Sequence, residues 1–109
     1  SYQIEGAAGK DGKGPSVWDT FSHKRGKVHN NENGDVSCDF YHRYATDIPF
    51  VKQMNMDVFR FSTGWARILP NGTGQVNQKG IDFYHRVIDT CLENGVQPWI
   101  TLYHWDLPQ

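Results

Sequence analysis

The residues best suited to chemistry lie at or just beyond the ends of two short β-prone runs, 58–62 and 96–102. Ser62 and Trp65 mark the end of the first run, and Tyr103-His104-Trp105-Asp106 follows the second. An imidazole can donate and accept hydrogen bonds, and an indole offers an apolar wall with one N–H donor. The chain is also rich in aromatic residues (14%) and nearly neutral, with a formal charge of −1. These features favour a neutral ligand on which aromatic rings can stack, and a sugar fits that description.

Charge and composition argue against several other classes of function. Basic residues form no stripe of the kind that binds nucleic acid, so we predict no nucleic-acid partner. Apolar runs are too short to span a bilayer, so we predict no membrane partner. Cys38 and Cys91 are far apart, which favours two reduced thiols over a disulfide and makes us expect a cytoplasmic protein. No metal or cofactor is predicted, because no metal-ligand spacing relates the histidines His23, His29, His42 and His85.

The first forty residues carry turn-forming stretches without an apolar period. Stretches 9–15 and 30–35 are rich in Gly, Lys, Asn and Asp. A long loop without secondary structure is uncommon in a compact domain unless it serves a function. We therefore predict a long functional loop here.

A first helix is predicted from residue 40 onward. Phe40, Tyr44, Ile48 and Val51 recur at spacings of four, four and three, which places them on one helical face. Asp39 could cap the start of this helix. Pro49 lies inside the stretch and should kink the helix or split it.

A second helix is predicted between the two β-prone runs. Pro70-Asn71-Gly72 forms a turn before it, Asn77 is a plausible cap, and Asn94-Gly95 should end it. Its apolar face contains Ile81, Tyr84, Val87, Ile88, Cys91 and Leu92.

This order of elements predicts an α/β fold. The sequence alternates helix, strand, helix and strand, and the connection between the two strands is long enough for parallel pairing. Such an order fits either a barrel or an open sheet. In (β/α)8 barrels the active site is built at the C-terminal ends of the strands, where the polar residues of this chain gather. Because eight units usually need about 250 residues, 109 residues are too few to close a barrel, and we expect an incomplete domain.

Five sequence blocks span the chain: SYQIEGA (1–7), GPSVWDTF (14–21), DFYHRY (39–44), FRFS with WARI (59–62 and 65–68) and YHWDLP (103–108). Together they resemble glycoside hydrolase family 1, the β-glucosidase family. The blocks occur in the family's order, which makes the match specific. The resemblance implies an N-terminal portion, about three of eight strands, of a (β/α)8 TIM barrel, with residues 1–109 as one incomplete domain.

The resemblance also implies roles for four residues. Gln3 and His104 match residues that hydrogen-bond hydroxyl groups of the glycone sugar, and Trp105 matches an aromatic residue that contacts the same ring. Arg60 matches the arginine beside the catalytic nucleophile, where a guanidinium keeps a carboxylate ionised. Purely structural roles stay open: Gln3 could be a solvated loop residue, and Trp105 could close the core. We assign Trp18 and Trp65 to packing.

The catalytic carboxylates of such an enzyme are not in this chain. Retaining glycosidases use two carboxyl groups about 5–5.5 Å apart. The chain has three glutamates, Glu5, Glu32 and Glu93, and none lies in the family's catalytic context. Glu93-Asn94-Gly95 spells a nucleophile triplet, but we interpret it as a helix end, and we expect Glu5 to support the structure.

The sequence therefore favours part of a retaining β-glucosidase that hydrolyses terminal β-D-glucosyl residues by double displacement. Its partners would be a small β-glucoside or oligosaccharide and the remainder of the barrel, and the 109 residues alone should be inactive. A 6-phospho-β-glycosidase remains open. The alternatives are a non-catalytic sugar-binding or assembly module derived from the same barrel, and a barrel completed by several copies of the chain.

Overall fold

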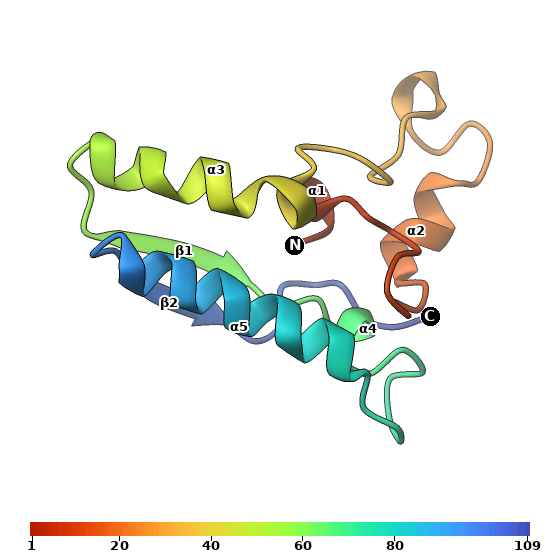
Figure 1. Cartoon of the computed structure of the whole chain (residues 1–109). Coiled ribbons are helices and arrows are strands. Elements are labelled where there is room, and N and C mark those ends of the chain that lie inside the picture. The colour runs from red at the N-terminus through yellow and green to blue at the C-terminus, as the bar shows by residue number, and fades with distance from the viewer.

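Two parallel strands and two long helices form the body of the structure, a computed structural model that describes all 109 residues (Figure 1). Shorter helices lie at the N-terminal side of this body and after the first strand. None of the helices combines the length and apolar character needed to cross a membrane. The elements are α1 (Tyr2–Glu5), α2 (Val17–Ser22), the 3₁₀ turn η1 (His29–Asn31), α3 (Phe40–Gln53), β1 (Val58–Ser62), α4 (Trp65–Ile68), α5 (Gln78–Glu93) and β2 (Gln97–Thr101).

Both long helices occupy the predicted positions. The helix α3 runs unbroken past Pro49, so the predicted split does not occur. Asp39 precedes α3, but it lies in the left-handed region and binds the His42 ring rather than a backbone N–H, so the predicted cap is wrong in its chemistry. The helix α5 ends as predicted, with Gly95 at φ 68° in the conformation that glycine adopts without strain.

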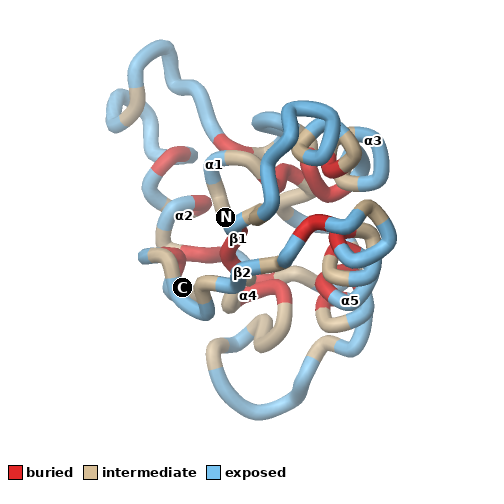
Figure 2. Tube along the Cα trace, turned by 90° about the vertical axis from the view of Figure 1, so that its left-hand side faces the viewer, coloured by how far each residue is buried: buried red, intermediate tan, exposed pale blue.

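The two strands pair in parallel and place alternate side chains on opposite faces. Phe59 and Phe61 lie on the face that α3 and α5 cover, and the Phe59 ring packs against Phe40 of α3 at 5.8 Å. Burying a phenylalanine of this kind contributes about 1.5–3 kcal/mol. The buried core lies between the helices and this face (Figure 2) and consists of Phe40, Tyr41, Ile48, Phe61, Phe83, Tyr84, Val87, Cys91 and Val96.

The opposite face of the sheet is open. Arg60 pairs in register with Trp99, and both side chains are exposed, as expected for alternate residues that point away from the helices. No other strand flanks this two-stranded sheet.

The N-terminal region is more ordered than the sequence analysis predicted. Ser16 and Asp19 form a capping box that starts α2, because each side chain bonds the other's backbone N–H. Residues 2–5 form a helical turn, so the structure contains two of the about three strands implied by the resemblance. The segment between α2 and α3 projects from the body and is mostly exposed (Figures 1 and 2).

Candidate functional site

A cavity of about 170 Å³ lies at the C-terminal end of the sheet and brings Arg60 and His104 together. The strand β1 supplies Arg60, Phe61 and Ser62 to its wall, and the end of β2 supplies Thr101. His104 lies in the loop after β2, and Ser1 and Ile4 close the side next to α1. The predicted gathering of polar residues at this end of the strands is therefore present in the structure.

Arg60 is held on the open face of the sheet. Its Nε donates a hydrogen bond of 3.1 Å to Thr101 Oγ1, which orients the guanidinium across the two strands. No carboxylate of this chain forms an ion pair with Arg60; the acidic partners of the salt bridges are Glu5, Asp19, Asp35 and Asp39. The exposed guanidinium is thus free to meet an anionic group.

Hydrogen bonds beyond the strand ends position the loop that carries His104. The backbone N–H of Thr63 donates to Thr101 O at 3.1 Å, and the Thr63 hydroxyl donates to Leu102 O at 3.1 Å. An edge-to-face contact joins Trp65 to Tyr103 at 6.0 Å. These contacts keep the loops that follow β1 and β2 side by side.

Trp105 lies in this loop with an unusual backbone conformation. Its φ is 67°, which costs a bulky residue about 1–3 kcal/mol, and its side chain is 69% exposed. Its ring makes an edge contact with Tyr103 at 5.6 Å. Trp105 is therefore not part of the core that these 109 residues form among themselves.

Gln3 lies on the helical turn α1 rather than in a loop. Its side chain is exposed and accepts a hydrogen bond from the Ser1 hydroxyl, and its backbone carbonyl accepts one from the Ser37 hydroxyl. The neighbours Ser1 and Ile4 line the cavity, but Gln3 and Trp105 do not. The sugar-binding roles of these two residues stay predictions.

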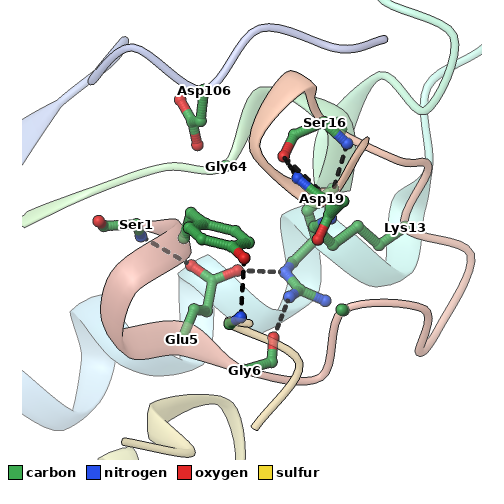
Figure 3. A pocket seen from close by; sticks show the side chains of 13 residues that line it. Ser1, Glu5, Gly6, Lys13, Ser16, Asp19, Gly64 and Asp106 are labelled. Carbon is green, nitrogen blue, oxygen red and sulfur yellow. Dashed lines mark hydrogen bonds and ion pairs between the residues drawn. The ribbon is translucent and has the colours of Figure 1, made fainter. Parts of the chain in front are cut away.

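A second, buried polar cluster lies around a separate small cavity, to which Ser1, Glu5 and Arg67 contribute (Figure 3). Glu5 forms an ion pair with the Nε of Arg67 and accepts a hydrogen bond of 2.8 Å from the Tyr84 hydroxyl. Burial and the negative charge of Glu5 raise the pKa of Tyr84 well above its ordinary value, so this phenol stays a donor. Arg67 Nη2 also donates to Gly6 O at 3.1 Å. The predicted structural role of Glu5 is confirmed.

Sequence reasoning gave Arg67 no role, although its side chain is completely buried. The guanidinium lies over the Tyr41 ring at 4.5 Å and joins α1, α4 and α5 through its Glu5 contact. The sequence did contain a signal for this role, because Arg67 stands in the largely apolar stretch WARI. An arginine in such a stretch is expected to be buried, and a buried charge needs a partner.

Two further carboxyl groups, those of Asp19 and Asp106, line the small cavity beside this cluster, and their pKa values are shifted in opposite directions. Burial alone would raise the pKa of Asp19, but hydrogen bonds from Lys13 and Ser16 bring it below the ordinary value. Burial raises the pKa of Asp106, and hydrogen bonds from the backbone N–H groups of Asp106 and His104 offset this only in part. One oxygen each of Asp19 and Asp106, together with Arg67 Nη1, has no protein partner. The cavity that they border has a volume of about 20 Å³, room for about one water molecule.

The remaining candidates for chemistry do not assemble into a site. His, Cys, Asp and Glu side chains form no group of three or more that could hold a metal ion. Glu93 ends α5, as interpreted from the sequence, and Glu32 is exposed beyond η1. Cys38 is exposed, Cys91 is buried in the core, and both are free.

Comparisons with solved structures define the class of protein. A family 1 β-glucosidase from Thermotoga maritima superposes with a TM-score of 0.97 at 56% identity, over 99% of this chain and 25% of that one. The same enzyme in complex with glucoimidazole gives a TM-score of 0.96, over 99% of this chain and 24% of that one, also at 56% identity. The chain thus has the fold of the N-terminal part of a (β/α)8 TIM barrel of a glycoside hydrolase.

Comparisons of sequence assign the family. The family model of glycosyl hydrolase family 1 matches residues 1–109. β-Glucosidase A of Acetivibrio thermocellus is 57% identical over 109 residues, which cover 100% of this chain and 24% of that protein. β-Glucosidase 6 of Oryza sativa subsp. japonica is 55% identical, over 100% of this chain and 21% of that protein. The chain belongs to glycosyl hydrolase family 1 and spans about a quarter of the length of these relatives.

Proposed function

We propose that these residues form the glycone-binding side of a retaining β-glucosidase that hydrolyses terminal β-D-glucosyl residues. The observation that carries the proposal is the convergence of Arg60 and His104 on one cavity at the C-terminal end of the strands. Active sites of (β/α)8 barrels lie at this end. The relatives named as β-glucosidases support the proposed substrate class.

Within this site His104 and Gln3 would bind hydroxyl groups of the sugar. An imidazole and an amide each offer both a donor and an acceptor, which matches the hydroxyl groups of a neutral sugar. The exposed ring of Trp105 would cover the apolar face of the same sugar. The Thermotoga maritima β-glucosidase has been solved in complex with glucoimidazole, which supports a glucose-like ligand for the present site.

Arg60 would stabilise the ionised nucleophile. Double displacement needs a carboxylate nucleophile and a second carboxyl group as acid/base. No glutamate of this chain takes either role, because Glu5 is buried in an ion pair and neither Glu32 nor Glu93 lines the cavity. Two glutamates outside these 109 residues would supply them. Because both catalytic carboxyl groups would come from outside these 109 residues, the 109 residues on their own would be inactive.

The test uses the complete protein that contains this chain. Steady-state hydrolysis of 4-nitrophenyl β-D-glucoside is compared with that of the galactoside and the 6-phosphoglucoside. We expect the glucoside to be preferred, and the His104→Ala variant to lose roughly 10- to 100-fold in kcat/KM, since a lost hydrogen bond costs about 1–3 kcal/mol. His85→Ala is the control, because His85 is exposed on α5.

Two results would contradict the proposal. A protein that binds glucose-type ligands without hydrolysing any glucoside would support the non-catalytic module. Faster hydrolysis of the 6-phosphoglucoside than of the glucoside would show that the protein is a 6-phospho-β-glycosidase instead.

A further inference from the structure

We propose that Trp18 is a positioning residue that sets the orientation of Trp105 toward the sugar. The inference rests on the proposed function, since it concerns a residue of the same site. It starts from the backbone of Trp105, whose φ of 67° lies in the region that favours glycine. A bulky residue keeps such a conformation only where its surroundings enforce it, and such residues cluster at functional sites.

The indole of Trp18 holds the carbonyl of this strained residue. Trp18 Nε1 donates a hydrogen bond of 2.7 Å to Trp105 O, across 87 positions of the sequence. The bond fixes the peptide plane that follows Trp105, and thereby limits the range of ψ at this residue. A side chain on a fixed backbone can sweep only the rotamers of its own χ angles.

Backbone contacts extend this link into a clamp, formed by residues 15–18 against residues 105–109. Val17 N donates to Leu107 O at 2.8 Å, and Gln109 N donates to Pro15 O at 2.9 Å. Ser16 and Pro108 form an antiparallel bridge between these bonds. The loop that follows β2 is therefore docked on the start of α2.

The clamp itself has a rigid base. Ser16 and Asp19 close the capping box of α2, and Lys13 forms an ion pair of 2.8 Å with Asp19. Asp106, next to Trp105, is buried and lines the same small cavity as these three residues (Figure 3). Both sides of the Trp18–Trp105 bond are thus attached to buried groups, while the Trp105 ring remains exposed.

The experiment compares Trp18→Phe with Trp65→Phe in the complete protein. Both variants keep an aromatic ring and lose one indole N–H. Trp65 Nε1 donates a bond of 3.0 Å to Gly72 O, and a phenylalanine ring at position 65 retains the edge contact with Tyr103. The probe is competitive inhibition by glucoimidazole. We expect Trp18→Phe to weaken inhibition roughly 5- to 20-fold, the effect of one lost hydrogen bond, and Trp65→Phe to change it less than twofold.

A double-mutant cycle with Trp105→Ala separates positioning from general stabilisation. If Trp18 acts through the Trp105 ring, its substitution has no further effect on inhibition once that ring is absent. The inference is overturned if Trp18→Phe and Trp65→Phe behave alike, or if the Trp18→Phe effect persists in the Trp105→Ala background. Unchanged inhibition in Trp105→Ala alone would instead refute the sugar-binding role of Trp105 in the proposed function.

A measurement on the unmodified protein covers the case in which Trp18→Phe does not fold. Hydrogen exchange of the indole N–H groups is followed by NMR with and without glucoimidazole. A ligand that packs on the clamped Trp105 must strengthen the clamp, by linkage, so exchange at Trp18 should slow more than at Trp65. Equal changes at the two indoles would overturn the inference.

Discussion

Arg67 carries a buried charge whose partners all come from other segments. Its ion pair with Glu5 and its bond to Gly6 O join the N-terminal residues to α4. The Tyr84 hydroxyl adds α5 to the same network, since it donates to Glu5 and accepts from Gly64 N at 2.6 Å. Removing one member of such a network leaves the others buried without partners.

We therefore expect Arg67→Met to lower the free energy of unfolding by about 3–5 kcal/mol, because the buried Glu5 carboxylate loses its guanidinium partner and keeps only neutral donors such as the Tyr84 hydroxyl among the side chains. Urea denaturation of the complete protein measures the loss. Arg25→Met is the matched control, since Arg25 is exposed and outside every ion pair, and it should change stability by less than about 0.5 kcal/mol. A loss under about 1 kcal/mol for Arg67→Met would show that the network is dispensable.

Asp106 and Asp19 should respond to pH in opposite directions. The raised pKa of Asp106 means that the folded state holds its proton more tightly than the unfolded state, whose pKa is near 3.8. The wild type should therefore lose stability relative to Asp106→Asn as pH rises from below 3.8 through the raised folded pKa. The midpoints of urea unfolding of the wild type and the variant, measured about every half pH unit between roughly pH 3 and pH 7, test the direction of this change.

Asp19→Asn supplies the internal comparison. Because the pKa of Asp19 is lowered in the folded state, Asp19 stabilises the wild type at pH values above its ordinary pKa of 3.8. That stability is lost as the pH falls through the folded pKa. The two variants should therefore diverge from the wild type in opposite senses across the acidic range. Parallel curves would mean that the two carboxyl groups share one environment.

At the scale of the elements, α5 packs against α4 at a glycine. A Cβ on Gly80 would lie 2.1 Å from Arg67 O, and the same carbonyl accepts a hydrogen bond of 2.9 Å from Asn77. This explains why Asn77 precedes α5 without capping it: its amide donates to Arg67 O and to Asp11 O instead. The start of α5 is thus fixed by α4 rather than by its own cap.

Gly80→Ala should destabilise the protein by about 1–3 kcal/mol, because the contact with Arg67 O outweighs the roughly 1 kcal/mol that alanine gains in a helix. Thermal unfolding monitored by circular dichroism shows whether the substitution lowers or raises the stability. Gly9→Ala is the control, since its Cβ would meet nothing within 4 Å, and it should be neutral or slightly stabilising. A stabilised Gly80→Ala protein would mean that α4 moves away without cost.

At the scale of the whole molecule, one face of the sheet and the loop after it expose apolar side chains. Trp99 on the open face of the sheet is 57% exposed. In the loop after β2, Leu102 is 78% and Trp105 69% exposed, with Tyr103 and Leu107 also exposed. Exposed apolar groups that lie together mark an interaction surface. The family fold places the remainder of a barrel beside such a sheet.

The 109 residues produced alone should therefore bind the dye ANS and associate, because this surface has no cover. Fluorescence with ANS and sedimentation velocity test the expectation. A dye-free monomer with a sharp cooperative unfolding transition would instead support the self-sufficient sugar-binding module.

Periodicity and turn chemistry alone predicted most of the regular structure. The strand Val58–Ser62, the helix that ends before Gly95 and the cluster of polar residues after both strands follow from local patterns, and all are present. The helical turn at residues 2–5 and the helix α2 were missed. Both lie in glycine-rich sequence without an apolar period, and long-range contacts from Ser37, Tyr84 and Leu107 hold them in place.

The sequence by itself determined the family, the order of the two long helices and two strands, and the residue types available for binding a sugar. Only the tertiary structure decided which side chains meet: that Arg60 and His104 share a cavity, that Glu5 pairs with Arg67, and that Trp18 holds Trp105. The reason is physical. Secondary structure follows contacts between near neighbours in the chain, whereas these contacts join residues 44 to 87 positions apart. Their geometry is set by the packing of helices on the sheet, which no local pattern contains.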